Sequence, residues 1–240
     1  SNSVKEDRRN KPMFTKGQST LAKIKHSERI FDDFKRENLL PNKLSQLGPG
    51  ISWGDIDNDN DNDVYIGGAS GYPGRIFVNN GNSEFIMKYQ SSFLGDKNFE
   101  DMGVLFIDVD EDGDLDLFVA SGGVECVPGS SLLLDRIYLN DGLGNFTKGH
   151  SSLMPDIRTS SSVVAAADID LDGTQEIFIG GRVVPGKYPL SPNSFIIKKI
   201  GSNYSDATNK LAPEIKNAGM VTSAIFSDVD IDGWPDLLVT

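Results

Sequence analysis

The chain has 240 residues, 38% of them hydrophobic, which favours a folded globular protein over a disordered one. Its 23 basic and 35 acidic side chains give a formal net charge of −12, which argues against nucleic acid as a partner. The sequence contains no run of 18 apolar residues and therefore predicts no membrane span. The single cysteine, Cys126, excludes a disulfide bond within the chain and is interpreted as a small apolar core residue.

The first 49 residues differ in charge from the rest of the chain. Residues 1–49 hold 11 basic and 6 acidic side chains, whereas residues 50–240 hold 12 and 29. We expect an N-terminal extension that is mobile over roughly its first twenty residues, with a short strand at 21–24. The extension is either a solvated tail or a strap across the acidic repeats. The chain opens on Ser1 without a methionine, which is compatible with a removed secretory signal.

Four acidic stretches organise the remainder of the chain. Their first aspartates stand at 55, 108, 168 and 228 and so recur at intervals of 53, 60 and 60 residues. A motif that recurs at such a period indicates a repeat architecture. The stretches hold 19 of the 35 acidic residues, so the negative charge is mostly local. They cover residues 55–63, 108–116, 168–176 and 228–236.

Short apolar segments on both sides of each acidic stretch predict β-strands. In the first repeat the predicted strands are 51–54, 63–68, 75–79 and 84–88. Asn80-Gly81 is a strong hairpin signal between the last two, because both residues tolerate positive φ. In the second repeat the predicted strands are 103–107, 116–123, 136–140 and one that begins at 145. The later repeats predict strands at 162–167, 176–181, 194–198, 221–227 and 236–240.

Four short strands per repeat, with almost no helix, predict an all-β fold built of propeller blades. The expected blades are about 50–100, 101–160, 161–219 and an incomplete one at 220–240, a partial β-propeller of about three and a half blades. A β-sandwich is the structural alternative, but it does not explain matching loops at a fixed period. Because an uncovered strand edge invites pairing, we expect the N-terminal extension or a second copy of the chain to cover it.

The acidic stretches predict calcium sites. Their candidate ligands are all oxygen donors, which favours a hard cation, and flexible coordination by six or seven oxygens favours Ca²⁺ over Mg²⁺. We expect carboxylates at positions one, three, five and nine, a backbone carbonyl at position seven, and a positive φ at position six. Position six is Asn60 in the first stretch and glycine in the other three.

An EF-hand is excluded, because position twelve is never glutamate and the flanking segments are strands. About four sites are predicted, with these ligands at positions one, three, five, seven and nine. They are Asp55, Asp57, Asp59, Asp61 and Asp63; Asp108, Asp110, Asp112, Asp114 and Asp116; Asp168, Asp170, Asp172, Thr174 and Glu176; and Asp228, Asp230, Asp232, Trp234 and Asp236.

With these motifs, the chain resembles the FG-GAP/VCBS repeat family, whose Asp-x-Asp-x-Asp-Gly-x-x-Asp loops bind calcium in integrin-α-like propeller repeats. It looks similar to bacterial VCBS-repeat proteins of the ASPIC/UnbV type. The resemblance covers about residues 45–240, and the segment Arg-Ile-Tyr-Leu-Asn-Asp-Gly at 136–142 strengthens it. Two departures weaken individual sites: Asn60 replaces glycine, and Glu176 replaces the final aspartate.

Three functions remain open from the sequence. The first is a non-enzymatic, extracellular or bacterial-envelope scaffold for cell adhesion or ligand binding, with an unidentified protein or glycan ligand. The second is the propeller portion of a larger secreted enzyme acting on polysaccharide or lipid, although the sequence carries no Gly-x-Ser-x-Gly or His-Glu-x-x-His motif. The third is a ligand site on the opposite face, formed by the loops after each second strand, which include Tyr72, Pro73, Val127, Pro128, Tyr188 and Pro189.

Overall fold

The computed structural model describes residues 20–82 and 84–240. Within them the chain folds into three four-stranded antiparallel sheets and one two-stranded sheet, each strand pairing with its neighbour in sequence. The first sheet contains β1 (Ile51–Gly54), β2 (Asp63–Ile66), β3 (Arg75–Asn79) and β4 (Phe85–Lys88). The second contains β5 (Asp101–Ile107), β6 (Asp116–Ser121), β7 (Arg136–Asn140) and β8 (Phe146–Lys148).

The third sheet contains β9 (Ser160–Ala167), β10 (Glu176–Val183), β11 (Phe195–Ile200) and β12 (Asn203–Asp206). The two-stranded sheet pairs β13 (Ala224–Ser227) with β14 (Asp236–Val239). These sheets confirm the all-β prediction. They also add a strand that the sequence did not predict, because the turn before β12 lacks an Asn-Gly pair. Gly201, with φ of 63°, makes that turn instead.

Helices are few and short in the described chain. The α-helices are α1 (Asp33–Arg36), α2 (Ser91–Gly95) and α3 (Thr208–Leu211). The 3₁₀-helices are η2 (Thr20–Lys23), η3 (Ser131–Leu133), η4 (Ser151–Leu153) and η5 (Pro213–Asn217). The strand predicted at 21–24 is therefore wrong, because this segment forms η2 and meets β4 through a side chain: Thr20 Oγ1 accepts from Phe85 N–H at 2.7 Å. Among these helices none is long and apolar enough to cross a membrane.

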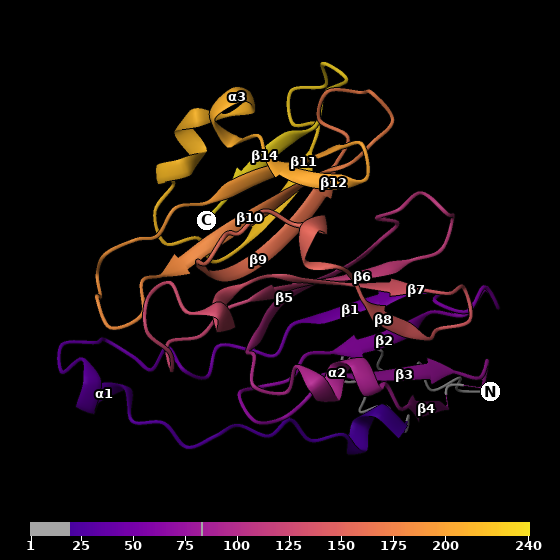
Figure 1. Cartoon of the computed structure of the whole chain (residues 1–240), viewed down its shortest axis with the longest axis horizontal. Coiled ribbons are helices and arrows are strands. Elements are labelled where there is room, and N and C mark those ends of the chain that lie inside the picture. Colours follow the sequence, from indigo (N-terminus) through magenta and orange to yellow (C-terminus); the bar gives the residue numbers. More distant parts are fainter. Residues whose placement is uncertain (1–19, 83) are drawn as a thin grey trace, which may run out of the picture.

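The first strands of successive sheets lie against one another: β5 contacts β1 and β9, and β13 contacts β9. This contact is close, since a Cβ added to Gly103 of β5 would approach the backbone of Val163 in β9 to 3.0 Å. Figure 1 shows the sheets following one another through the molecule, with the first sheet at the bottom and the third near the top. Such stacking of four-stranded antiparallel sheets is the packing used between propeller blades.

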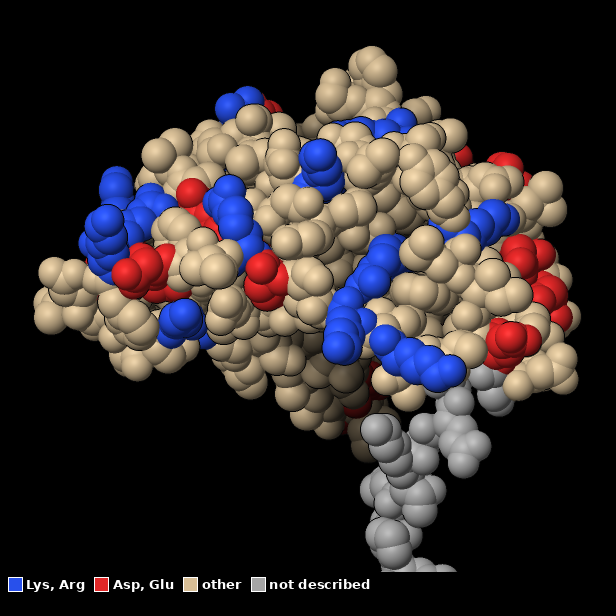
Figure 2. All heavy atoms as spheres, turned by 90° about the horizontal axis from the view of Figure 1, so that it is seen from below, with Lys and Arg blue, Asp and Glu red and all other residues tan. Residues whose placement is uncertain are grey.

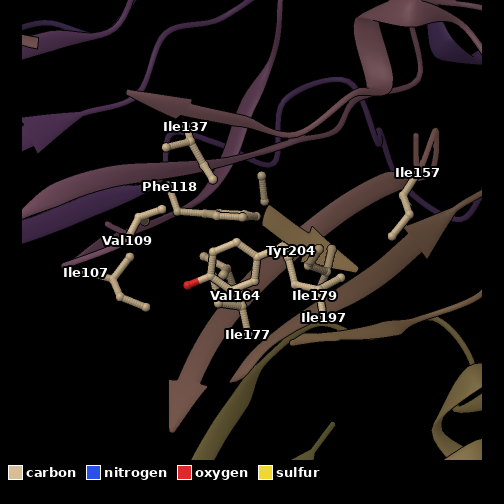
Figure 3. Packing of buried hydrophobic residues seen from close by; sticks show 11 residues of the cluster. Ile107, Val109, Phe118, Ile137, Ile157, Val164, Ile177, Ile179, Ile197 and Tyr204 are labelled. Atoms are coloured by element: carbon tan, nitrogen blue, oxygen red, sulfur yellow. The ribbon is translucent and has the colours of Figure 1, made fainter. Parts of the chain in front are cut away.

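Apolar side chains fill the space between neighbouring sheets. Between the second and third sheets, Phe118 of β6 and Ile137 of β7 meet Val164 of β9 and Ile177 of β10 (Figure 3). A separate cluster between the first two sheets includes Tyr65 and Phe93. Because the second sheet lies between the first and the third, its strand β6 is buried along its whole length, whereas β1 of the first sheet alternates between exposed and buried residues.

The described part of the N-terminal extension is a strap, which we define as residues 20–49. It crosses all three four-stranded sheets: Thr20 bonds to β4, Arg36 donates to the carbonyl of Val124, and Glu37 accepts from Tyr188 N–H at 2.6 Å. The buried side chains of Leu40 and Leu44 anchor it between the second and third sheets. The tail predicted to be mobile lies outside the described residues.

From Lys25 onward the strap and the acidic loops lie at opposite ends of the strands, whereas Thr20 meets Phe85, the first residue of β4, on the loop side. The strap contacts connections that follow β2, β6 and β10, whereas the acidic loops precede these strands. In Figure 1 the loops project to the right and α1 lies at the left. Most of the strap, which was predicted to lie across the acidic surface, therefore covers the other end. Figure 2 shows Lys and Arg side chains spread over the lower face, with acidic groups among them at the left and a further set of acidic groups along the right edge.

Candidate metal loops

The four acidic loops close in the same way around their first aspartate. In every loop the position-one carboxylate accepts a hydrogen bond from the backbone N–H at position six. These bonds are Asp55–Asn60 at 2.8 Å, Asp108–Gly113 at 3.0 Å, Asp168–Gly173 at 2.9 Å and Asp228–Gly233 at 3.0 Å. The repeated sequence pattern therefore produces one repeated turn, which holds the alternate acidic side chains in a fixed relation.

The position-nine carboxylate links each of the first two loops to the third strand of its sheet. Buried Asp63 accepts from Ile56 N–H at 3.0 Å and from Asn79 N–H, on β3, at 2.8 Å. Asp116 repeats this pattern with Val109 at 2.9 Å and Asn140 at 2.8 Å. An ion bound to this carboxylate would therefore be tied to both ends of the loop and to a neighbouring strand.

Three carboxylates converge in each loop, with one oxygen atom from each lying within 4.8 Å of the others. In the first three loops they come from positions one, three and nine: Asp55, Asp57 and Asp63; Asp108, Asp110 and Asp116; Asp168, Asp170 and Glu176. In the fourth they come from positions one, three and five, Asp228, Asp230 and Asp232. Asp236 lies outside that group, and its Oδ2 accepts from Val229 N–H at 3.0 Å.

Position five lies outside the converging groups in the first three loops, and its predicted role as a ligand stays a prediction. Asp59, Asp112 and Asp172 fall outside the converging groups, and each accepts the backbone N–H of position seven at 2.9–3.0 Å. At position seven, Asp61, Asp114, Thr174 and Trp234 lie outside the converging groups as well. Their predicted role as carbonyl ligands stays a prediction.

The first loop holds the clearest sign of a missing positive partner. Oδ1 of Asp57 is buried and has no hydrogen-bond partner, although an unpaired buried carboxylate oxygen is costly. Burial and the neighbouring Asp59 and Asp55 raise the pKa of Asp57. A cation at this position would supply the missing interaction. The donor set is entirely carboxylate oxygen, which suits a hard divalent ion.

The buried position-nine carboxylates of the first two loops also have raised pKa values. Burial raises the pKa of Asp63, partly offset by the two backbone N–H groups that it accepts from. Burial likewise raises the pKa of Asp116 to about 6, and the nearby Asp110 and Asp112 raise it further. Opposite charge near a carboxylate lowers its pKa. A cation bound in either loop would favour the ionised form of these carboxylates.

Backbone strain in the loops extends beyond the predicted position six. That position has positive φ in all four loops, including Asn60 at 70°, as the sequence predicted. Position four has positive φ too, in Asn58, Glu111, Leu171 and Ile231, at 54–66°. Such a conformation costs roughly 1–2 kcal/mol for a residue with a side chain, and it is least expected for β-branched Ile231. Leu171 and Ile231, which are both exposed, are not residue types that predict a positive φ from the sequence.

The third loop differs from the first two by one side chain. Lys198, on β11, places its Nζ at 2.9 Å from Asp170 Oδ2, 2.8 Å from Asp172 Oδ2 and 2.5 Å from Glu176 Oε1. Burial lowers the pKa of Lys198, but the hydrogen bonds with Asp172, Glu176 and Asp170 outweigh it and raise that pKa above its usual value. The first, second and fourth loops therefore fit a divalent cation, whereas the third already contains an ammonium.

Neighbouring loops also contact one another. Asn58 Nδ2 of the first loop donates to Asp114 Oδ1 of the second at 2.9 Å. Lys199 Nζ of β11 donates to Glu111 Oε1 of the second loop at 2.9 Å. The first two loops are therefore hydrogen-bonded to each other, and the second is bonded to β11 of the third sheet.

The residues expected to form a ligand site at the opposite end are divided between exposed and covered positions. Tyr72 and Val127 are exposed, whereas Tyr188 packs against the strap. The two histidines make local contacts: His26 bonds to Glu28 at 2.7 Å, and His150 accepts the N–H of Ser152 in η4. A buried ion pair between Arg136 and Asp101 was not predicted from the sequence, although Arg136 stands where Arg75 stands in the first repeat.

Comparison with known proteins agrees with this geometry. Residues 46–119, which include the first two acidic loops, match the model of the FG-GAP-like repeat. This segment is an FG-GAP-like repeat. The chain is also similar to cartilage acidic protein 1 of Mus musculus, with 26% identity over 198 residues. That match covers 80% of the chain and 28% of the relative, so the chain spans little more than a quarter of that protein. The resemblance to FG-GAP repeats is thereby confirmed for residues 46–119.

Proposed function

We propose that this chain is a non-enzymatic, calcium-binding FG-GAP scaffold in which ions bound to the first two loops lock the first two strands of each of these sheets to its third strand. The observation that carries the proposal is the convergence of three carboxylates in each loop, with the buried Asp57 Oδ1 left unpaired in the first. Oxygen-only donors and an adaptable turn favour Ca²⁺ over Mg²⁺, which demands near-ideal octahedral geometry. Calcium would neutralise the clustered charge and bridge the position-one, position-three and position-nine side chains.

The sheets are proposed to form part of a β-propeller. Support comes from the four-stranded antiparallel units, from the contacts of β5 with β1 and β9, and from the FG-GAP-like repeat at 46–119. A propeller presents its loops at two ends, and the calcium loops occupy one of them. The other end, formed by the connections that follow β2, β6 and β10, is proposed to take a protein or glycan ligand.

An extracellular location is part of the proposal. Loops of this type in extracellular modules bind calcium at roughly 10⁻⁴–10⁻³ M, a range that external calcium fills and cytosolic calcium does not. The similar protein is named for cartilage, and FG-GAP-like repeats support an adhesion or ligand-binding role. The contacts of His26 and His150 give no support to a catalytic role, because each bonds to a residue two positions away in the chain.

Thermal unfolding tests the calcium assignment. A ligand that binds only the folded state at ten times its Kd adds about 1.4 kcal/mol per site to the free energy of unfolding. We expect the melting temperature to fall on chelation, to recover with millimolar Ca²⁺, and to recover far less with equimolar Mg²⁺. A melting temperature indifferent to chelator and to added calcium would overturn the proposed function.

A further inference from the structure

The third acidic loop carries its own cation. We infer that the ammonium of Lys198 replaces the divalent ion in this loop, so that the loop is held closed in the absence of calcium. This inference rests on the proposed function for its count of ions, but the role of Lys198 in the metal-free protein can be tested without it.

The first argument is the number and placement of the lysine's contacts. Nζ of Lys198 lies 3.0 and 2.9 Å from the two oxygens of Asp170, 2.8 Å from Asp172 and 2.5 Å from Glu176. Two of these partners, Asp170 and Glu176, belong to the converging group of that loop. Nζ therefore stands where the carboxylates meet, and its side chain is mostly buried, with 18% exposed. A divalent ion could occupy this position only after the ammonium had moved out.

The second argument is the strand register. The first residue after each loop's position nine pairs with a residue on the third strand of the sheet, and the residue after that partner is aliphatic in the first two sheets. Val64 pairs with Phe77, which is followed by Val78. Leu117 pairs with Tyr138, which is followed by Leu139. In the third sheet Ile197, opposite Ile177, is followed by Lys198. The lysine thus replaces an aliphatic side chain at one fixed position of the repeat.

The third argument is a compensating change in the position-nine carboxylate. In the first two loops both oxygens of the aspartate accept backbone N–H groups, the second one from Asn79 or Asn140. In the third loop Glu176 keeps the bond to Ile169 N–H at 3.0 Å, and its other oxygen turns to Lys198. The longer glutamate and the lysine act together, so the two departures of this loop from the repeat pattern have one explanation.

The ion pairs also distinguish the third loop from the first two. In the described chain, no ion pair joins Lys or Arg to the converging carboxylates of the first two loops, whereas Lys198 pairs with Asp170 and Glu176 in the third. A permanent intramolecular cation does not depend on the calcium concentration. The third sheet therefore keeps its shape when the first two lose their ions, and it would serve as the fixed centre of a calcium-dependent stack.

The test counts calcium and measures melting for Lys198→Leu, which restores the residue type of the first two sheets. Isothermal titration calorimetry and native mass spectrometry on the full chain should give one more bound Ca²⁺ for Lys198→Leu than for the wild type. The double variant Lys198→Leu/Glu176→Asp, which restores the whole pattern, should bind that additional ion more tightly. In chelator, Lys198→Leu should melt several degrees below the wild type, and calcium should reverse the loss.

The matched control is Lys199→Leu, which removes the adjacent lysine and its contact with Glu111 but leaves the third loop intact. It should leave the calcium count unchanged and alter melting in chelator far less than Lys198→Leu. Equal counts for wild type and Lys198→Leu, with equal affinities, would overturn the inference while leaving the proposed function standing. If the wild type and both leucine variants bind no calcium, the proposed function fails, and equal melting of Lys198→Leu and Lys199→Leu would then overturn the role of Lys198 as well.

Discussion

The carboxylates at the two ends of the sheets have different interaction partners. At the strap end, Asp101 is paired with buried Arg136, and it accepts further bonds from Tyr65 Oη and Gly68 N–H at 2.7 Å each. At the acidic-loop end, the first two loops gather carboxylates that only backbone N–H groups and one another surround, apart from the electrostatic influence of Lys88 on Asp57. The strap end therefore provides an internal cation for Asp101, whereas no Lys or Arg of the described chain forms an ion pair with the converging carboxylates of the first two loops.

The third loop resembles the strap end, because its carboxylates are paired with a basic side chain of the chain itself. Lys198 gives it the internal cation that Arg136 gives to Asp101. The repeat pattern alone therefore does not decide whether the carboxylates of a loop have an internal cation.

The largest expected effect comes from breaking the internal pair at the strap end. Arg136→Met leaves Asp101 buried without its cation, and loss of one member of such a pair typically costs about 3–5 kcal/mol. It also removes the stacking of the guanidinium over Phe99, whose ring centre lies 4.2 Å away. Urea unfolding should show this loss with or without calcium. Arg75→Met, at the equivalent but only half-buried position, should cost less than about 1 kcal/mol, and equal losses would contradict the account.

The next effect should come from an acidic loop and should depend on calcium. Asp116→Asn removes the buried position-nine carboxylate, so the second loop should lose its ion. The protein should then lose about 1–3 kcal/mol of calcium-dependent stability. Asp114→Asn, at position seven of the same loop, is the control and should keep most of that stability. Melting curves in chelator and in millimolar calcium distinguish the two. An Asp116→Asn protein that gains as much from calcium as the wild type would exclude this site.

A pH effect is expected from the boundary between the strap and the sheets. Burial raises the pKa of Glu100 to about 8, only partly offset by the hydrogen bond from Ser70 N–H. Because the folded-state pKa exceeds the ordinary 4.5, the stability that this group contributes is full below about pH 4.5 and is lost as the pH rises through about 8. Over that window the slope reaches about 1.4 kcal/mol per pH unit.

Glu100→Gln removes that slope and should make the protein relatively more stable than the wild type at pH 9. Unfolding free energies measured between pH 5 and pH 9 would reveal the change. The exposed substitution Glu214→Gln should leave the profile unaltered. Parallel profiles for wild type and Glu100→Gln would show that Glu100 ionises normally in the folded protein.

The smallest expected effect tests the strain in the loops. Ile231 has a φ of 63° and 88% of its surface exposed, so its side chain loses little packing when it is replaced. Ile231→Gly should stabilise the metal-free protein by about 0.5–1 kcal/mol through relief of the left-handed conformation. The same change at exposed Ile86, which lies in the regular strand β4, should destabilise the protein instead.

Much of the fold could be predicted from the sequence because strands and acidic loops recur in a fixed order. The Asn80-Gly81 turn and the apolar runs located most strands to within a few residues. The strand β12 was missed because its turn lacks that signal. The segment that contains η2 was predicted as a strand because the four residues 21–24, three of them apolar, are too few to show a period. The converging positions one, three and nine were included among the predicted ligands, since alternate side chains of a tight turn point to one side.

What the sequence could not supply was contact between distant segments. Lys198 and Glu176 are 22 residues apart, and only the pairing of β10 with β11 brings them together. Arg136 and Asp101 meet across 35 residues for the same reason. The direction of the strap was equally hidden: its basic composition suggested the acidic loops, but Leu40 and Leu44 draw it to the apolar gap at the opposite end.

The central claim is tested most directly by a crystal structure determined in millimolar calcium, with anomalous scattering used to locate the ions. We expect one ion among Asp55, Asp57 and Asp63 and another among Asp108, Asp110 and Asp116, while the ammonium of Lys198 remains among the acids of the third loop. Carboxylates of the first two loops turned toward solvent, with no ion between them, would contradict the account.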